Sequence, residues 1–188
     1  NRIGDTLDVL LQESLRIAHD TGALKKSDLA RVTVDTTVQP KNITFPTDAK
    51  LLLMAIQQLG KLAKEHDVPL RQSYGRVAKT AAMMAGRYAH AKQYKRMHKQ
   101  LKFLRTRLGR MIRDIRRKTE GNEELQTLFA VPLIKARQIR EQKQGQRGWK
   151  LYSWHAPETE CIAKGKAAKP YEFGVKVSLT TTNKRCKG

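Results

Sequence analysis

A short stretch near the start of the chain alternates hydrophobic and polar residues with a period of two. Valine and threonine fill most of residues 31–38, and Pro40 follows shortly afterwards. β-branched residues in this pattern favour a strand that the proline ends. Asp35 lies in the middle of it, although strands disfavour aspartate and an unpaired buried carboxylate is costly. We therefore expect Asp35 either to meet a cation or several hydrogen-bond donors, or to be exposed on the solvent face of an edge strand.

Apolar residues spaced by three and four predict helices on both sides of this strand. Residues 3–18 form an amphipathic helix pattern that stops at the Thr21-Gly22 pair. A second helix runs from the N-cap Thr47 to about His66, with Asp48 in its first turn, where a negative charge is favoured. We interpret Asp48 as a capping carboxylate, and an accessory metal or substrate ligand is the alternative.

The longest helical pattern extends from Met84 to Ile115 with heptad-like spacing. It predicts one long helix, or two collinear helices broken near Gly86. A shorter helix from Glu123 to about Gln142 contains Pro132, which should interrupt it.

The period returns to two after the turn at residues 144–148, which predicts strands at 149–155 and 171–182. A strand, about a hundred residues of helix and two further strands indicate an α/β (α+β) fold whose sheet is split by a helical insertion. The expected sheet pairs the Asp35 strand with residues 150–155. The expected segments are an N-terminal helical segment at 1–30, a first core strand at 31–46, a basic helical insertion at 47–148 and two core strands at 149–188.

The charge of the chain is strongly one-sided. It has 38 Lys and Arg against 17 Asp and Glu, a formal net charge of +21. Fifteen of these cations lie between Arg76 and Lys118, where Asp114 is the only acid. Such a run lacks the opposite charges that normally stabilise a solvated helix face, so it favours a polyanionic partner.

Double-stranded DNA is the expected partner, because phosphate contacts from such a surface give affinity without sequence preference. No apolar run approaches the length of a membrane span, and no signal peptide opens the chain, so we expect a cytoplasmic protein that does not bind membranes. Tyr88, Tyr94, His90 and His98 lie among the cations and either stack on nucleic acid or pack in the core. The residues expected to contact DNA are Lys92, Lys95, Arg96, Lys99, Lys102, Arg105, Arg110, Lys164 and Lys166.

Two blocks of sequence resemble one protein family in the same order. The first is Val34-Asp35-Thr36-Thr37-Val38-Gln39-Pro40, followed by Phe45-Pro46-Thr47-Asp48-Ala49. The second comprises Tyr152-Ser153-Trp154-His155-Ala156-Pro157-Glu158, Glu160-Cys161-Ile162, Lys164-Gly165-Lys166 and Tyr171-Glu172-Phe173-Gly174-Val175-Lys176-Val177. These blocks resemble the DDE transposases of bacterial insertion sequences, in the branch called insertion sequence five.

The resemblance implies a ribonuclease H-like core whose first three strands form an antiparallel meander. It makes Asp35 a catalytic residue and ligand of two Mg²⁺ ions that support DNA cleavage and strand transfer in transposition. It also implies a nucleoid-associated bacterial protein, a homodimer in full-length form. The family's second Asp and catalytic Glu have no counterpart here, and Glu158 and Glu160 match other positions of the family. His155 either has a structural role at a strand end or lies near the active site. We therefore expect an inactive piece lacking the N-terminal region and the C-terminal part of the catalytic domain.

A non-catalytic basic nucleic-acid-binding protein is the alternative, with Asp35 an ordinary strand residue. The charge agrees equally well with that function, but the ordered pair of blocks favours the transposase.

Overall fold

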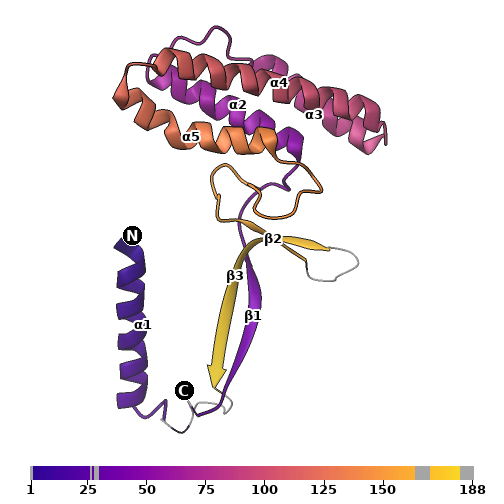
Figure 1. The fold of residues 1–188 in the computed structure, drawn as a ribbon. Helices are drawn as coiled ribbons and strands as arrows, with labels where there is room; N and C mark the ends of the chain where they lie inside the picture. Colours follow the sequence, from indigo (N-terminus) through magenta and orange to yellow (C-terminus); the bar gives the residue numbers. More distant parts are fainter. Residues whose placement is uncertain (1, 26, 28–29, 164–169, 183–188) are drawn as a thin grey trace. The chain divides into compact units, whose positions relative to one another are not determined.

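The computed structural model describes residues 2–25, 27, 30–163 and 170–182. They form a mixed α/β chain, as the sequence predicts (Figure 1). The chain divides into two compact units, Asn1–Gln39 with Lys176–Gly188, and Pro40–Val175. The elements in chain order are α1 (Arg2–Asp20), β1 (Val32–Pro40), α2 (Asp48–Glu65), α3 (Gly75–His90), α4 (Tyr94–Thr119), α5 (Glu123–Glu141), β2 (Glu160–Ala163) and β3 (Tyr171–Thr182).

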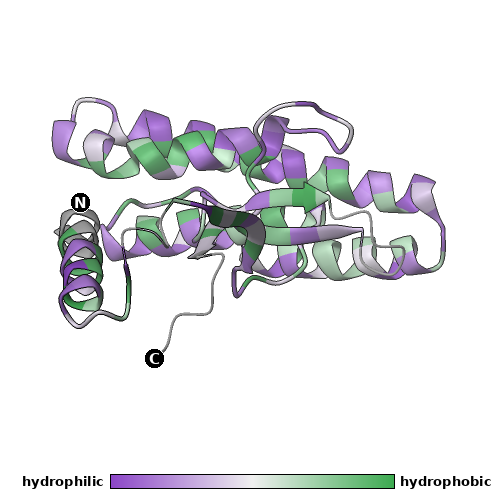
Figure 2. Ribbon diagram, turned by 90° about the horizontal axis from the view of Figure 1, so that it is seen from below, coloured by the Kyte–Doolittle hydropathy of each residue, from purple (hydrophilic) through white to green (hydrophobic). Residues whose placement is uncertain are grey.

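The second unit is built on a bundle of α2, α3, α4 and α5. Helix α2 packs on the other three helices, and α4 packs on α3 and α5. Hydrophobic and hydrophilic residues alternate in bands along these helices (Figure 2). The core is formed by apolar side chains from all four helices, and its largest fully buried members include Leu52, Ile56, Leu104, Leu108 and Phe129.

The predicted helix from residue 47 is confirmed. Thr47 is the N-cap of α2, and its hydroxyl accepts a hydrogen bond of 3.3 Å from the backbone N–H of Lys50. Asn122 caps α5 in the same way by accepting 3.0 Å from Leu125. Side-chain oxygens at both positions thus satisfy N–H groups that have no partner within the helix.

The predicted interruption of α5 at Pro132 is wrong. The helix continues through this residue to Glu141. Phe129 and Leu133, on either side of the proline, are buried in the core. Packing of these side chains outweighs the loss of one backbone hydrogen bond.

The predicted break near Gly86 is also wrong. Gly86 lies within α3, and the chain turns at residues 91–93, so that α3 and α4 pack against each other instead of running collinearly (Figure 1). Lys92 occupies the left-handed region at φ 55°, and the N–H of Gln93 donates 2.8 Å to the carbonyl of Tyr88. This is a Schellman helix end with lysine at the position that usually holds glycine, which is why the sequence did not reveal it.

The three strands form one sheet in the order β1-β3-β2. Strands β2 and β3 are antiparallel, with Cys161 opposite Phe173 and Ala163 opposite Tyr171. The predicted strands at 31–38 and 171–182 are confirmed and share this sheet. The Asp35 strand, however, pairs with β3 and not with residues 150–155, so β3 takes the middle place that a meander gives to the second strand.

The predicted strand at 149–155 is not formed, and β2 begins at Glu160. The main chain of Leu151 is instead hydrogen-bonded to the side-chain amide of Gln142. The amide oxygen accepts from the backbone N–H of Leu151, and the amide nitrogen donates to the carbonyl of Leu151, each at 3.1 Å. Leu151 is fully buried. These two bonds replace the partners that a neighbouring strand would have supplied, so the segment packs against the bundle without regular secondary structure.

Candidate nucleic-acid interface

The solvent-facing side of α4 carries a line of cations. Positions 95, 99, 102, 106, 110, 113 and 117 follow each other at intervals of three or four residues, and all seven are exposed. The opposite side of the helix holds the buried core residues. Only Thr106 is uncharged, and its hydroxyl donates 2.8 Å to the carbonyl of Lys102. We call the other six the basic stripe: Lys95, Lys99, Lys102, Arg110, Arg113 and Arg117.

The basic stripe has dimensions suited to duplex DNA. At a rise of 1.5 Å per residue, the 22 steps from Lys95 to Arg117 extend for about 33 Å, which is close to one turn of B-DNA. The stripe itself contains no carboxylate. Among the described residues, its ion pair with an acid is that of Arg117 with Asp114 at 3.0 Å. Such a row can meet several phosphates along one side of a duplex.

Four of the residues predicted from sequence to contact DNA belong to this stripe, namely Lys95, Lys99, Lys102 and Arg110. Lys92 is exposed in the turn that precedes it. Arg96 lies beside the stripe, where it donates 3.0 Å to Gln93 and its guanidinium lies 5.8 Å from the ring centroid of Tyr88. Lys164 and Lys166 lie outside the described residues.

Arg105 is placed differently from the other predicted contacts. It points towards α2, where its guanidinium donates 2.8 Å to the carboxylate of Asp48. This pair also shows what Asp48 does: it lies in the first turn of α2 and ties α2 to α4. Arg105 therefore contributes to packing between helices, whereas the stripe residues face solvent.

The interleaved aromatic and histidine residues do not enter the core. Tyr94 is exposed, Tyr88 is half-buried beneath Arg96, and His90 and His98 are exposed. Tyr94 is therefore available to a ligand at the same end of α4 as Lys95.

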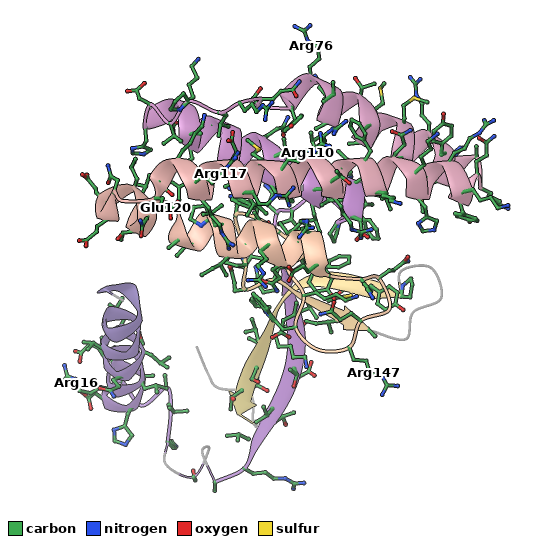
Figure 3. The ribbon with its side chains drawn as sticks, turned by 45° about the horizontal axis from the view of Figure 1, so that its top comes forward. Arg16, Arg76, Arg110, Arg117, Glu120 and Arg147 are labelled. Atoms are coloured by element: carbon green, nitrogen blue, oxygen red, sulfur yellow. The ribbon has the colours of Figure 1, made fainter. Side chains whose placement is uncertain are left out.

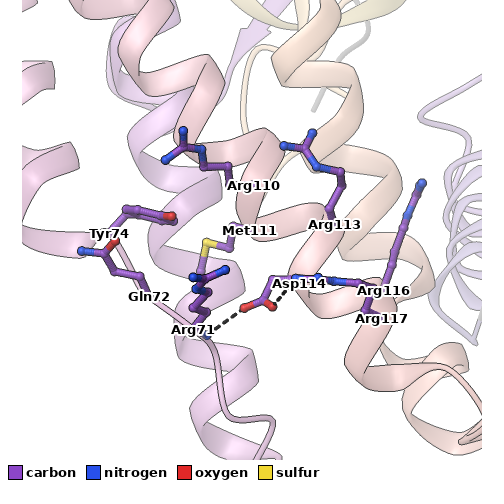
Figure 4. Close-up of a pocket in the computed structure, with 9 residues that line it drawn as sticks. All are labelled: Arg71, Gln72, Tyr74, Arg110, Met111, Arg113, Asp114, Arg116 and Arg117. Atoms are coloured by element: carbon purple, nitrogen blue, oxygen red, sulfur yellow. Dashed lines mark hydrogen bonds and ion pairs between the residues drawn. The ribbon is translucent and has the colours of Figure 1, made fainter.

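A cavity that was not predicted from the sequence lies at the other end of the stripe. It has a volume of about 770 Å³ and is open to solvent. Arg110 and Arg117 are labelled on α4 in Figure 3, and Figure 4 shows the cavity in close-up. The run of arginines at the end of α4 was visible in sequence, but the loop before α3 that completes the wall was not. The lining residues are Arg71, Gln72, Tyr74, Arg110, Met111, Arg113, Asp114, Arg116 and Arg117.

Among the described residues, Asp114 is the only carboxylate that lines this cavity, and only 7% of its surface is exposed. It accepts 2.7 Å from the backbone N–H of Arg71 and 3.0 Å from the guanidinium of Arg117 (Figure 4). Burial alone would raise the pKa of Asp114, but the Arg71 hydrogen bond and the positive charges of Lys118 and Arg117 together lower it. Asp114 is thus an ionised carboxylate that joins the loop before α3 to α4.

Asp35 does not have the surroundings expected of a metal ligand. It is exposed on β1, which is an edge strand of the described sheet, and its carboxylate has no hydrogen bond or ion pair to another described residue. The described part of the chain contains no group of three His, Cys, Asp or Glu side chains able to hold a metal ion. The residues present therefore do not fit a site for two Mg²⁺ ions. Of the two surroundings expected for Asp35, the structure shows the exposed position on an edge strand.

The two sequence blocks that flank the helices meet in the second unit. Lys41, next to the first block, donates 3.0 Å to Glu158 of the second, and its backbone N–H donates 3.2 Å to Phe173. The ring of Phe173 packs edge-on against Phe45 at 5.4 Å. The pKa of Glu158 is lowered, first by its own backbone N–H and then by the hydrogen bond from Lys41. Glu158 is therefore an ion-pair partner between the blocks, and its neighbour His155 lines an adjoining cavity of about 510 Å³.

None of the described helices is both long enough and apolar enough to cross a lipid bilayer. No protein-family model and no solved structure matches the chain. A curated protein of Rhizobium meliloti, "Uncharacterized protein ORF8 in nfe locus", is 53% identical over 94 residues, which make up 50% of this chain and 45% of that protein. The match thus spans less than half the length of this relative, whose name states no activity.

Proposed function

We propose that this chain binds duplex DNA through the basic stripe of α4, as part of a DDE transposase of a bacterial insertion sequence. The observation that carries the DNA-binding proposal is the stripe itself, with six exposed cations on one side of a single helix. Each cation that neutralises a phosphate releases counterions, which is the main source of sequence-independent affinity. Replacing any one of them should therefore weaken binding similarly for all sequences.

The transposase part of the proposal rests on the two sequence blocks. They are about a hundred residues apart, and the contacts of Lys41 with Glu158 and Phe173 bring them together. We propose that β1, β2 and β3 belong to a ribonuclease H-like core, although their order β1-β3-β2 differs from that of a meander. Helices α2 to α5 would then be a helical insertion within this core. DNA cleavage and strand transfer, as in DNA recombination by mobile elements, would then be the activity of the complete protein.

Magnesium chemistry is no part of the mechanism proposed for this chain. Asp35 could supply one carboxylate, but the described residues contain no group of three His, Cys, Asp or Glu side chains able to hold a metal ion. Two-metal phosphoryl transfer requires several such ligands. What the described residues do is hold the helices in place and present cations to a phosphate backbone.

A non-catalytic DNA-binding protein is the second candidate function. The observation that favours it is the exposed, unpaired Asp35 on an edge strand. Both candidates use the same basic stripe, so they share the DNA-binding test and differ only in the chemistry of the complete protein.

The DNA-binding test is a salt titration with a fluorescently labelled 30-base-pair duplex. The wild-type chain is compared with a variant that carries Lys92→Gln, Lys95→Gln, Lys99→Gln and Lys102→Gln. Each lost phosphate contact should reduce the slope of log K against log salt by about 0.9, so the slope should become shallower by about three units or more. A control that removes one charge is Arg105→Gln, whose slope should equal that of the wild type because Asp48 already pairs with this arginine. An unchanged slope in the lysine variant would contradict the proposal.

A further inference from the structure

The cavity at the C-terminal half of α4 has walls from two parts of the chain. Arg110, Arg113, Arg116 and Arg117 come from α4, and Arg71 comes from the loop that joins α2 to α3. In Figure 4 Asp114 lies between Arg71 and Arg117, and the dashed lines mark its bonds to both. Five arginines therefore surround a space that contains one carboxylate.

That carboxylate leaves most of the positive charge uncompensated. Asp114 accepts hydrogen bonds from the backbone of Arg71 and from the side chain of Arg117, so the guanidinium of Arg117 is the one that it neutralises. Among the described residues, the guanidinium groups of Arg71, Arg110, Arg113 and Arg116 have no ion-pair partner. Four unpaired like charges around one cavity repel each other, and a bound anion would remove this repulsion.

The chemistry of the lining favours phosphate as the anion. A guanidinium presents a planar fork of N–H donors that matches two oxygens of a phosphate group. Gln72 adds an amide and Tyr74 a hydroxyl from the loop before α3. A volume of about 770 Å³ also leaves room for more than one phosphate.

The position of the cavity indicates where such phosphates come from. Arg110, Arg113 and Arg117 line the cavity and are also the last three residues of the basic stripe. A DNA strand that follows the stripe along α4 therefore reaches the cavity without leaving the helix. We propose that this arginine cavity is a phosphate-binding pocket that holds adjacent phosphates of the DNA backbone. This inference rests on the proposed DNA-binding function and adds an anchoring point to it.

The test uses arginines that belong to the cavity but not to the stripe. The pocket variant carries Arg71→Gln and Arg116→Gln, both exposed and without ion-pair partners among the described residues. The control variant carries Arg76→Gln and Arg87→Gln on α3, which removes the same charge from exposed positions outside the cavity. Figure 3 shows Arg76 projecting from α3. Thermal unfolding of each variant checks that the bundle is intact, and Arg71→Gln alone is a second pocket variant.

Duplex affinity is measured by fluorescence anisotropy, and calorimetry with sodium tripolyphosphate probes the pocket alone. We expect the pocket variant to bind the duplex about tenfold more weakly than the control variant and to lose tripolyphosphate binding. If both variants bind the duplex equally, the pocket inference is overturned and the proposed function stands. If the wild type binds tripolyphosphate but no duplex, the proposed function and the DNA source are overturned. If the wild type binds neither probe, both proposals are overturned.

Discussion

The side-chain amide of Gln142 and the main chain of Leu151 are joined by two hydrogen bonds of 3.1 Å each. Gln142 is the C-cap of α5, and both residues are buried. The amide thus satisfies a buried N–H and a buried carbonyl at once, in the manner of a neighbouring strand. This contact fixes the path of the chain as it leaves the helical bundle.

Replacing Gln142 with alanine should destabilise the bundle by about 2 kcal/mol, because it leaves two buried main-chain groups of Leu151 without partners. The measurement is the free energy of unfolding from a urea titration. The control is Gln144→Ala, an exposed position in the same loop, which should change the free energy by about 0.5 kcal/mol or less. Equal effects of the two substitutions would show that the paired hydrogen bonds do not stabilise the fold.

Asp114 should make the stability of the bundle depend on pH in the acid range. Its pKa is lower in the folded chain, so the unfolded state binds more protons over the interval between the two pKa values. The stabilisation is therefore fully present above the unfolded value of about 3.9. It is lost as the pH falls through the folded value.

Asp114→Asn tests this dependence, since asparagine has a similar shape and no titrating carboxyl. The variant should be less stable than the wild type at neutral pH, by about 1–3 kcal/mol, and the difference should shrink as the pH is lowered below 4. Urea titrations at a series of pH values measure it. A difference that stays constant with pH would mean that the carboxylate charge does not contribute.

Two glycines in the bundle should respond differently to alanine. A Cβ at Gly86 meets no atom within 4 Å, whereas a Cβ at Gly109 would lie 2.7 Å from Nε of Arg140. Gly86→Ala should stabilise α3 by about 0.5–1 kcal/mol. Gly109→Ala requires the flexible end of the Arg140 side chain to move, which offsets part of the same gain, so this variant should be less stable than Gly86→Ala by up to about 1 kcal/mol. Thermal unfolding compares them, and equal midpoints would contradict close packing of α5 on α4.

The helices could be predicted from sequence because their signals are local. The apolar period of α2 and the cap at Thr47 lie within one stretch of chain, and so does the α4 pattern that predicts an exposed basic side. The errors occurred where distant residues decide the outcome. Pro132 stays helical because its neighbours are buried, and the strand expected at 149–155 is replaced by the side chain of Gln142.

The candidate site could be predicted only in part for the same reason. Exposure of Lys95, Lys99 and Lys102 follows from the period of α4 alone. The engagement of Arg105 by Asp48, 57 positions earlier, requires knowledge of how α2 packs on α4. The arginine cavity likewise depends on the loop containing Arg71, which lies 43 positions before Asp114.

The last prediction concerns Asp35 and the chemistry of this chain by itself. We expect the chain to show no metal-dependent nicking of supercoiled plasmid, and its Asp35→Asn variant to behave identically. Two-metal phosphoryl transfer needs several carboxylate oxygens in one place, and the described residues contain no group of three acidic, His or Cys side chains. The effects of replacing residues that act as a catalytic unit are strongly non-additive, so a site with one carboxylate should retain little activity.

The nicking assay is run with Mg²⁺ and with Mn²⁺, and DNA binding by both proteins is measured alongside it as a control for folding. Nicking that requires metal and disappears in the Asp35→Asn variant would contradict the prediction, because other carboxylates of this chain would then have to complete the site. Asp48, Glu158, Glu160 and Glu172 would be the first to replace, although Asp48 and Glu158 are already paired with Arg105 and Lys41.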